Sequence, residues 1–392
     1  MLGKRVKTIR TFRFTFLALI SMLVLICDAS GQATKTAGLV FDVHTFVSKT
    51  LGEERTILVT LPKGYERSDA KYPVVFMLDA HEPQNVMMTG ILDQQAWGRK
   101  IPEAILVGIQ NTNRVRDLTP TPTERPTSGG GSKFLQFIET EVVPLVDKNY
   151  RTLPFRVFAG HSLGGLFVVY SFVEKPDLFN AYIAASPVLG WDNNYVIKRA
   201  ETVFKQDKQW KKRLFAAMGD EPEYMAGFNS FQTLLNREKP KDFGFAFQQF
   251  KDENHGSVVL PTYYAGLRMV FEGWTPATIG SLEDVEMHYR RLSDRLGFSV
   301  LPPEDLLINL GVDLFNSKRS DEAITVFRRN SEIYPGSPRA FDNLAVAYER
   351  TGRLKQAREN FEKAFKAADL RNDSESAKTA KENLDRLAAK TN

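Results

Sequence analysis

Short apolar runs alternate with longer amphipathic segments between residues 73 and 250. Continuous apolar runs of this length are typical of strands that are buried on both faces of a sheet. Segments with helical spacing, at residues 134–146, 163–173 and 224–236, lie between several of the runs. Strands that alternate with helices predict an α/β fold, in which helices cover both faces of a mainly parallel sheet. The runs are Pro73–Asp79, Ala104–Ile109, Phe155–Ala159, Ala181–Ala185, Arg213–Met218 and Phe245–Phe250.

Three further segments differ from this pattern, two before it and one within it. Residues 40–47 and 53–61 are predicted to form paired strands before the first buried run, because the second of them alternates apolar and polar residues. Residues 119–132 are rich in Thr, Pro and Gly and contain no apolar side chain to bury, which indicates a mobile surface loop. This loop follows a predicted strand, so it either covers a site at the strand ends or is a solvated connection.

From Ser281 onward the chain is predicted to be helical, and it contains an internal repeat. Asn309-Leu310 recurs as Asn343-Leu344, Ala323 as Ala357, and Phe327 as Phe361, always at an offset of 34 residues. This is the period of a tetratricopeptide repeat, in which each unit is a pair of helices. Residues 374–389 form an amphipathic helix that would cap the array. The tail is either a groove for a protein or peptide partner or a stabilising appendage.

The first 31 residues resemble a secretory signal peptide. Five cations precede the apolar stretch Phe14–Cys27, and Ala29-Ser30-Gly31 supplies the small residues of a cleavage site. We expect an exported protein, periplasmic or secreted; the alternative is an uncleaved membrane anchor. The net charge of the whole chain is +5, and this segment holds five cations and one carboxylate, so the remainder carries only about +1. The charge therefore does not indicate nucleic-acid binding.

Cysteine chemistry is excluded from the mature chain. Cys27 is the only cysteine, and it lies within the export segment. Disulfides, thiolate metal sites and a cysteine nucleophile are thus ruled out for the remainder. We expect no metal site and no cofactor.

The strongest local motif is Gly160-His161-Ser162-Leu163-Gly164, a G-x-S-x-G sequence. It follows an apolar strand and precedes an apolar helix, which is the strand–turn–helix setting of a nucleophile elbow. Glycines are needed at both ends because side chains there would collide with the adjacent strand and helix. Ser162 is therefore the predicted nucleophile, and the N–H of Leu163 is a predicted donor to the oxyanion.

A serine hydroxyl needs a base, and the chain has five histidines. His255 follows the last buried strand and comes after the serine, as the order Ser, acid, His requires. We predict it to be the general base, ahead of His81. The acid should lie between the two, in the loop that offers Asp220, Glu221 and Glu223. Glu221 is the preferred candidate, although the sequence leaves all three open.

The second oxyanion donor should come from the loop after Pro73–Asp79, and the N–H of Ala80 or His81 is the candidate. His81 is also a candidate for contact with the substrate, because it follows a sheet strand.

Several motifs together resemble the esterase family of α/β-hydrolases that includes feruloyl esterases, hydrolases of trilactone siderophores, S-formylglutathione hydrolase and the mycolyl transferases. The resemblance spans about residues 40–274. It implies an α/β-hydrolase fold with a triad of Ser162, His255 and an acid in residues 219–223. The motifs are Tyr72–Asp79, Ile105–Ile109 with Asn113–Pro120, Gly160–Gly165, Ala185–Pro187 and Glu253–Gly256.

The resemblance also implies that residues 114–117 border the active site. Arg114 would bind an anionic or oxygen-rich substrate there, unless the segment's arginines pair with Asp117 instead. The chain departs from many relatives at Ala80, where glycine is common after the aspartate, and this affects the geometry of the second oxyanion donor.

These observations predict a signal peptide (1–31), an α/β-hydrolase esterase domain (32–275), a linker helix (276–302) and a TPR-like helical domain (303–392). The expected function is hydrolysis of small-molecule carboxylic esters, and a siderophore-type ester is a candidate by family analogy. Acyl transfer by the same triad is one alternative. The other is a binding protein whose tail carries the function on a non-catalytic hydrolase scaffold.

Overall fold

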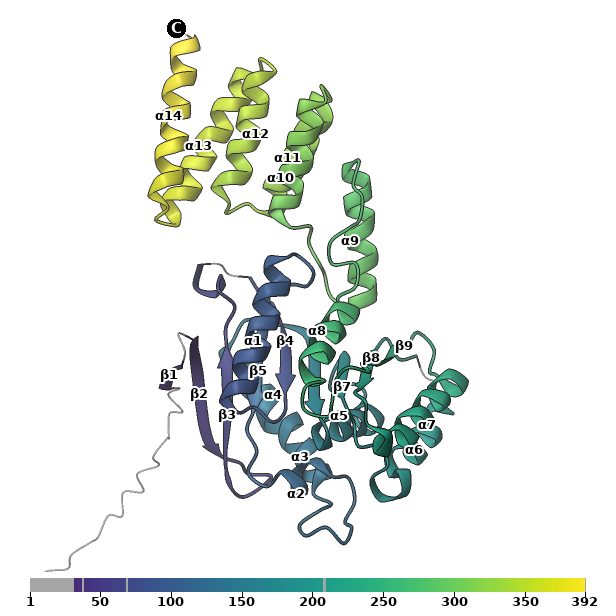
Figure 1. Ribbon diagram of the computed structural model, residues 1–392. Coiled ribbons are helices and arrows are strands. Elements are labelled where there is room, and N and C mark those ends of the chain that lie inside the picture. Colours follow the sequence, from purple (N-terminus) through teal and green to yellow (C-terminus); the bar gives the residue numbers. More distant parts are fainter. Residues whose placement is uncertain (1–31, 37–38, 68–69, 207–208, 392) are drawn as a thin grey trace, which may run out of the picture.

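The computed structural model describes residues 32–36, 39–67, 70–206 and 209–391 (Figure 1). A nine-stranded sheet in the order β1-β2-β3-β5-β4-β6-β7-β8-β9 forms its centre within this part of the chain. The six strands β4 to β9 run parallel to one another. Strands β1, β2 and β3 pair antiparallel and form an edge next to β5. The strands are β1 (Gln32–Thr36), β2 (Leu39–Val47), β3 (Glu54–Thr60), β4 (Tyr72–Met77), β5 (Ile105–Ile109), β6 (Thr152–His161), β7 (Ala181–Ala185), β8 (Arg213–Met218) and β9 (Gly244–Gln249).

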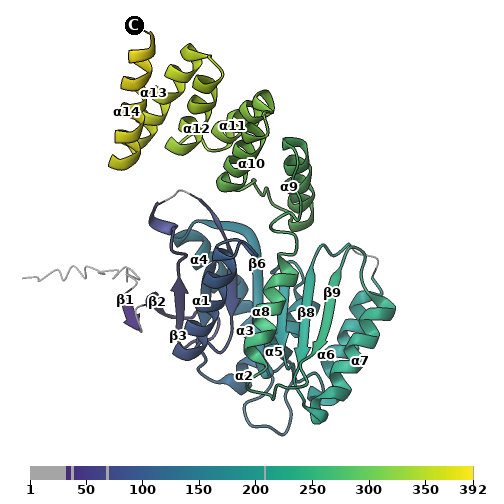
Figure 2. The same ribbon diagram turned by 45° about the horizontal axis from the view of Figure 1, so that its top comes forward.

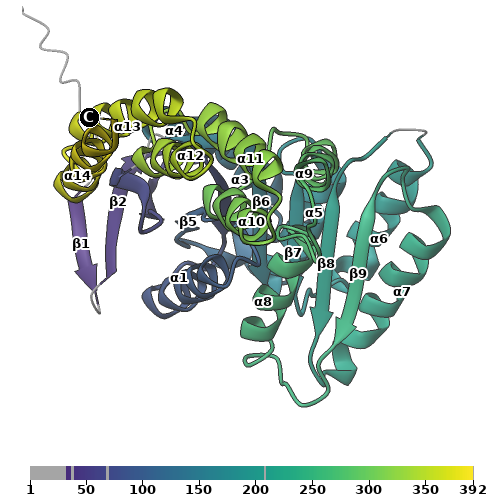
Figure 3. The same cartoon turned by 90° about the horizontal axis from the view of Figure 1, so that it is seen from above.

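Helices cover both faces of this sheet, as the apolar runs predict (Figure 3). In β4, Val74 and Phe76 belong to the core beneath α5, while Val75 and Met77 belong to the core on the α1 and α8 side. The α/β class is therefore confirmed. The helices of this part are α1 (Glu82–Trp97), α2 (Arg114–Leu118), α3 (Gly131–Phe137), α4 (Val143–Asn149), α5 (Leu163–Glu174), α6 (Trp191–Phe204), α7 (Pro222–Glu238) and α8 (Val259–Val270), with a 3-10 turn at Tyr65–Arg67 and a π turn at Ile138–Val142.

The Thr- and Gly-rich segment 119–132 differs from the expected mobile loop at both ends. Thr119 is buried, its hydroxyl accepts a hydrogen bond from the N–H of Gly129 at 2.8 Å, and Trp191 donates to Thr121 at 3.2 Å. Gly131 already belongs to α3. Only the tip, residues 122–127, is exposed, and none of the segment lines the cavity described below. Local hydrogen bonds thus anchor a segment that has no apolar side chains to bury.

Beyond the sheet, the chain continues into helices α9 (Leu282–Leu296), α10 (Glu304–Asn316), α11 (Ser320–Ile333), α12 (Pro338–Arg350), α13 (Leu354–Leu370) and α14 (Ser374–Thr391). The pair α10–α11 and the pair α12–α13 begin 34 residues apart, matching the sequence repeat. Ala323 and Ala357 are fully buried, and so are Phe327 and Phe361. The helical tail is therefore confirmed as an architecture, while its tetratricopeptide assignment stays a prediction.

The tail stands at the edge of the sheet where the parallel strands begin. Seen from the side and from above, α9 lies over the β7–β8 region and α10–α14 form an arc over the opposite half of the sheet (Figures 2 and 3). The loops at the carboxyl ends of the strands are thus left uncovered by the tail. Helix α9 falls within the segment predicted as a linker.

The predicted signal peptide, residues 1–31, lies outside the described residues. In the part that the structure does describe, no helix combines the length and apolar character needed to cross a membrane.

Candidate active site

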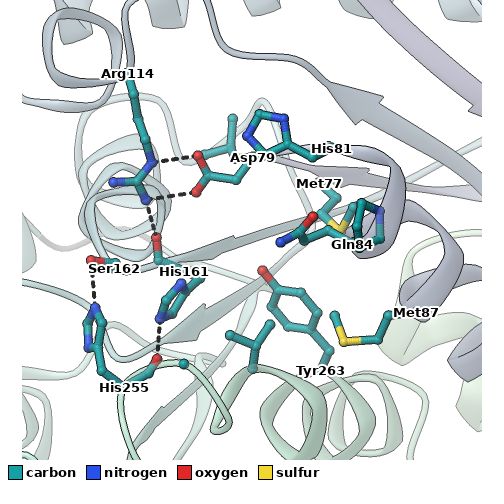
Figure 4. A pocket seen from close by; sticks show the side chains of 14 residues that line it. Met77, Asp79, His81, Gln84, Met87, Arg114, His161, Ser162, His255 and Tyr263 are labelled. Carbon is teal, nitrogen blue, oxygen red and sulfur yellow. Dashed lines mark hydrogen bonds and ion pairs between the residues drawn. The ribbon is translucent and has the colours of Figure 1, made fainter.

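The carboxyl ends of β4, β5, β6, β8 and β9 bring together residues from five separate loops. A parallel sheet places all these ends along one edge, so residues far apart in sequence meet there. The loops after β4, β5, β6 and β9 line a cavity of about 550 Å³ (Figure 4), which is within the usual range for small-molecule sites. Ser162, His255, Arg114 and His81 all line this cavity, as the sequence predicts for a shared site.

Ser162 occupies the sharp turn between β6 and α5. Its φ of 60° lies in the left-handed region, which side chains other than glycine adopt only when the surrounding structure enforces it. The N–H of Ser162 donates to the carbonyl of Ala185 at 2.9 Å, and this bond holds the turn against β7. A Cβ atom at Gly160 would lie 2.5 Å from the carbonyl oxygen of Gly164, which explains the glycine there. The turn therefore has the strained geometry of a nucleophile elbow.

His255 lies next to Ser162, in the loop after β9. Its Nε2 is 2.9 Å from the Ser162 Oγ, and its Nδ1 donates a short hydrogen bond to Oε2 of Glu221. The side chain is 36% exposed on the cavity side, so a substrate can reach it. Serine, imidazole and carboxylate thus form one continuous series of hydrogen bonds.

Of the three candidate carboxylates, Glu221 is the one that reaches His255. Its side chain is 2% exposed, and its second oxygen accepts hydrogen bonds from the Ser186 hydroxyl at 2.5 Å and the Gly219 N–H at 3.0 Å. Asp220 and Glu223 are exposed on the same loop. A buried carboxylate with every oxygen bonded is held in one orientation, as a partner for an imidazole requires.

His161 supports the same loop from the other side. Its Nε2–H donates to the backbone carbonyl of His255 at 2.6 Å, and the two imidazole rings lie 4.6 Å apart. Burial, followed by the charge of His255, lowers the pKa of His161. The ring in contact with the base is therefore harder to protonate than a free imidazole, and sequence reasoning did not identify this contact.

Arg114 reaches the cavity from α2, and of the two arginines in this segment it is Arg116, not Arg114, that pairs with Asp117. The Arg114 guanidinium binds Asp79 through two hydrogen bonds of 2.7 and 2.9 Å and donates to the His161 carbonyl at 3.1 Å. Asp117 instead binds Arg55 and Arg116. Asp79 therefore orients Arg114 beside the serine turn, and the position of Asp79 at the end of a buried strand is the sequence signal for this role.

The predicted second oxyanion donor requires a correction. The N–H of Ala80 donates to the carbonyl of Ile109 at 3.2 Å, and the N–H of His81 donates to the carbonyl of Asp79 at 2.8 Å. Ala80 is also completely buried. The chain folds back against β5 at this point, so neither N–H is available to a substrate. Leu163 differs, because it is the first residue of α5, where N–H groups have no acceptor within the helix.

The cavity wall opposite Arg114 is apolar and carries one buried hydroxyl. Met77, Met87 and Val259 line it, and the hydroxyl of Tyr263 points into the cavity although its side chain is only 2% exposed (Figure 4). Sequence reasoning missed Tyr263, because helical spacing alone does not separate a core aromatic from one that lines a site. Two of the other histidines lie elsewhere: His44 bonds Tyr150, and His288 bonds the carbonyl of Gly273.

Comparison with known proteins agrees with this geometry. The family model described as "Putative esterase" matches residues 48–257. The ferri-bacillibactin esterase BesA of Bacillus subtilis (strain 168) is 27% identical over 261 residues, which cover 59% of this chain and 90% of that protein. The apo-salmochelin esterase of Escherichia coli O6:H1 is 29% identical over 223 residues, which cover 50% of this chain and 67% of that protein.

Two solved structures extend the comparison. An IroE-like serine hydrolase from Shewanella oneidensis is 30% identical, with a TM-score of 0.68, and the match covers 75% of this chain and 99% of that one. An uncharacterised protein from Capnocytophaga ochracea shares the fold at 18% identity, with a TM-score of 0.61, over 89% of this chain and 99% of its own. A family match over more than half of the chain, together with these relatives, shows that the chain belongs to this esterase family and is a carboxylic ester hydrolase.

Proposed function

We propose that the chain cleaves esters by acyl-enzyme chemistry, with Ser162 as nucleophile, His255 as general base and acid, and Glu221 as the acid of the triad. The observation that carries the proposal is the unbroken series of hydrogen bonds from the Ser162 Oγ through His255 to Glu221. The strained turn at Ser162 gives independent support, since such strain persists only where the fold enforces it.

In this mechanism the Ser162 Oγ attacks the ester carbonyl carbon while His255 Nε2 accepts the hydroxyl proton. Glu221 holds the His255 tautomer that leaves Nε2 free to accept, and it stabilises the imidazolium that forms. The tetrahedral intermediate then collapses, and the imidazolium protonates the departing alcohol. Water attacks the acyl-enzyme with the same base, which releases the acid and restores Ser162.

The N–H of Leu163 stabilises the oxyanion from the start of α5, where the helix dipole also favours negative charge. Arg114 presents a guanidinium to the cavity that its ion pair with Asp79 and its hydrogen bond to the carbonyl of His161 hold in place. His81, in the loop after β4, also lines the cavity and is a candidate contact for the substrate.

The substrate that we propose is a bulky, oxygen-rich ester of the siderophore type. The relatives named for ferri-bacillibactin and apo-salmochelin support this class. The cavity supports it too, because an arginine faces an apolar wall of methionine, valine and tyrosine across about 550 Å³. Such a surface suits a ligand that combines aromatic groups with many oxygens.

The test is a panel of esters: p-nitrophenyl acetate and butyrate, a feruloyl ester and a catecholate trilactone. We expect the trilactone to give the highest kcat/KM, and Ser162→Ala to lower kcat for every ester by about 10⁴-fold or more. Glu221→Gln should lower kcat by about 10⁴-fold. The matched control is Glu223→Gln, since Glu223 is exposed on the same loop.

Different failures separate the parts of the proposal. Equal rates for Ser162→Ala and wild type would exclude Ser162 as the nucleophile. Trilactone hydrolysis no better than that of butyrate would reject the substrate class and leave the triad in place. An acylated alcohol formed in the presence of an added acceptor would favour acyl transfer. Export of the chain and a partner for its tail stay predictions from the sequence.

A further inference from the structure

A second cavity, of about 510 Å³, lies at the opposite end of the sheet from Ser162. Arg213 begins β8 and Gly244 begins β9, so the cavity opens at the amino ends of these strands. Its other wall is α9, which contributes Arg291 and Arg295 and stands over this part of the sheet (Figure 2). The cavity thus joins the sheet to the first helix of the tail.

The charges around this cavity are unbalanced. Five cations line it against two carboxylates, Asp242 and Asp294. No ion pair joins these carboxylates to any of the five cations in the described part of the chain; Lys212 instead reaches the fully exposed Asp177, at 3.6 Å. The five cations are Lys211, Lys212, Arg213, Arg291 and Arg295.

Two of these cations are removed from water without a counter-ion in contact. Arg213 and Arg295 are both half-buried, and the Arg295 guanidinium donates from Nη2 to the backbone carbonyl of Glu272 while its Nε is buried with no hydrogen-bond partner. Burial lowers the pKa of both guanidinium groups, and the charge of Arg213 lowers that of Arg295 further. The exposed Glu272 acts in the opposite direction on both and does not compensate. Gathering like charges in this way costs stability unless an anion lies among them.

We propose that this cavity binds a small oxyanion, of the phosphate or carboxylate class, between Arg213 on β8 and Arg295 on α9. Planar guanidinium groups match two oxygens of such a group, and Lys212 adds a point charge beside them. Phe155, Phe243 and Leu296 form apolar walls, so the site also accepts an apolar body attached to the anion. The bound anion would hold the tail helix α9 against the sheet, far from the catalytic serine.

The experiment follows thermal unfolding of the purified protein in sodium phosphate, pyrophosphate or citrate, against sodium chloride at equal ionic strength. Binding to the folded state raises the melting temperature, and above Kd the rise grows with the logarithm of the anion concentration. We expect Arg213→Gln and Arg295→Gln to raise the Kd fitted to this dependence about tenfold or more. In chloride alone Arg213→Gln should melt no lower than wild type, because the charge that disfavours the Arg295 cation is removed, whereas Arg295→Gln also loses its hydrogen bond to the carbonyl of Glu272. Esterase activity on p-nitrophenyl butyrate should not change.

The matched control is Arg237→Gln, which removes an exposed arginine of α7 that pairs with Glu201. Its response to the anions should equal that of wild type. If the variants of the half-buried arginines fold poorly, Lys211→Gln replaces them in the test, because Lys211 is exposed at the rim of the cavity. We expect it to reduce the rise in melting temperature with phosphate by a smaller but measurable amount. Phosphate and citrate series that differ in affinity identify which oxyanion the site prefers. A shift that is absent, that chloride reproduces, or that persists in Arg213→Gln and Lys211→Gln would overturn the proposal.

Discussion

At the scale of single residues, His161 is placed to hold the proposed base in position without touching the reacting atoms. Its one donated hydrogen bond goes to the backbone of His255, at 2.6 Å, and its ring packs against the His255 ring. His255 stands on a loop, where small displacements are easy. Since a shift of about 1 Å costs about a hundredfold in rate, a bond that fixes this loop matters to catalysis.

We therefore expect His161→Leu to lower kcat for p-nitrophenyl butyrate by ten- to a hundredfold, with little change in KM. His161→Gln keeps an N–H donor of similar reach and should retain most of the lost activity. The control is His288→Leu on α9, which removes an equivalent bond to the carbonyl of Gly273. If the Leu and Gln variants lost activity equally, the hydrogen bond would not be the cause.

Residue identity was predictable from the sequence where a motif dictates local geometry, and not where a partner is distant. Ser162 sits in its strand–turn–helix motif, and chain order singles out His255. The contact between His161 and the His255 carbonyl joins loops 94 positions apart, and no local pattern contains it. The prediction that the Ala80 N–H binds the oxyanion fails for a related reason, because a sequence does not show that this N–H faces the Ile109 carbonyl.

At the scale of elements, a buried ionic network holds α2, and thereby Arg114, against β3. Arg55 is 1% exposed, and it binds Asp117 at 2.7 Å while its guanidinium lies over two phenylalanine rings. Arg116 binds both Asp117 and Glu53. Because α2 begins at Arg114, this network sets where the Arg114 side chain enters the cavity.

The network predicts a specific loss of stability in acid. Hydrogen bonds from Arg116 lower the pKa of Glu53 from 4.5 to about 2. A carboxylate with a depressed pKa in the folded state stabilises the fold above pH 4.5, and that contribution falls as the pH drops from 4.5 to 2. Its size is well below the about 3 kcal/mol that the full pKa shift would give, because solvent screens the partly exposed Glu53. Urea unfolding of wild type and Glu53→Gln at pH 7, 4 and 3 measures it.

We expect Glu53→Gln to have a lower free energy of unfolding than wild type at pH 7. The difference in unfolding free energy between the two should narrow towards pH 3. The control is Glu54→Gln, the neighbouring carboxylate, which forms no ion pair in the described part of the chain. A difference that is constant with pH would mean that Glu53 contributes by packing alone.

Elements with strong periodicity were predictable, and those that depend on tertiary partners were not. The buried parallel strands match their apolar runs. Sequence reasoning misses α1, whose segment mixes Gly90 and several polar residues with its apolar ones, and β1, a short polar strand that pairs with β2. Both are stabilised by what they pack or pair against, which a single-sequence pattern does not contain.

At the scale of the whole molecule, one apolar core runs from the sheet into the tail. Phe155 of β6 packs against Phe271 and Phe298, and the same cluster continues through Tyr289 of α9 to Leu307 of α10. The tail is therefore not tethered by an open linker. A shared core of this kind couples the unfolding of its two halves, because opening one exposes apolar surface of the other.

This coupling predicts that damage to the tail reaches the catalytic site. Leu307→Ala removes a fully buried side chain from α10, which should cost about 2–5 kcal/mol. We expect the helical signal in circular dichroism and the residual esterase activity to be lost together, at a temperature lower than in wild type. Leu370→Ala is the matched control, because Leu370 is 76% exposed at the end of α13.

A shared core would be contradicted if the helical signal of Leu307→Ala fell in two steps while its activity was lost at the wild-type temperature. Such an outcome would make the tail a unit that unfolds independently of the sheet, in spite of the apolar contacts that join them.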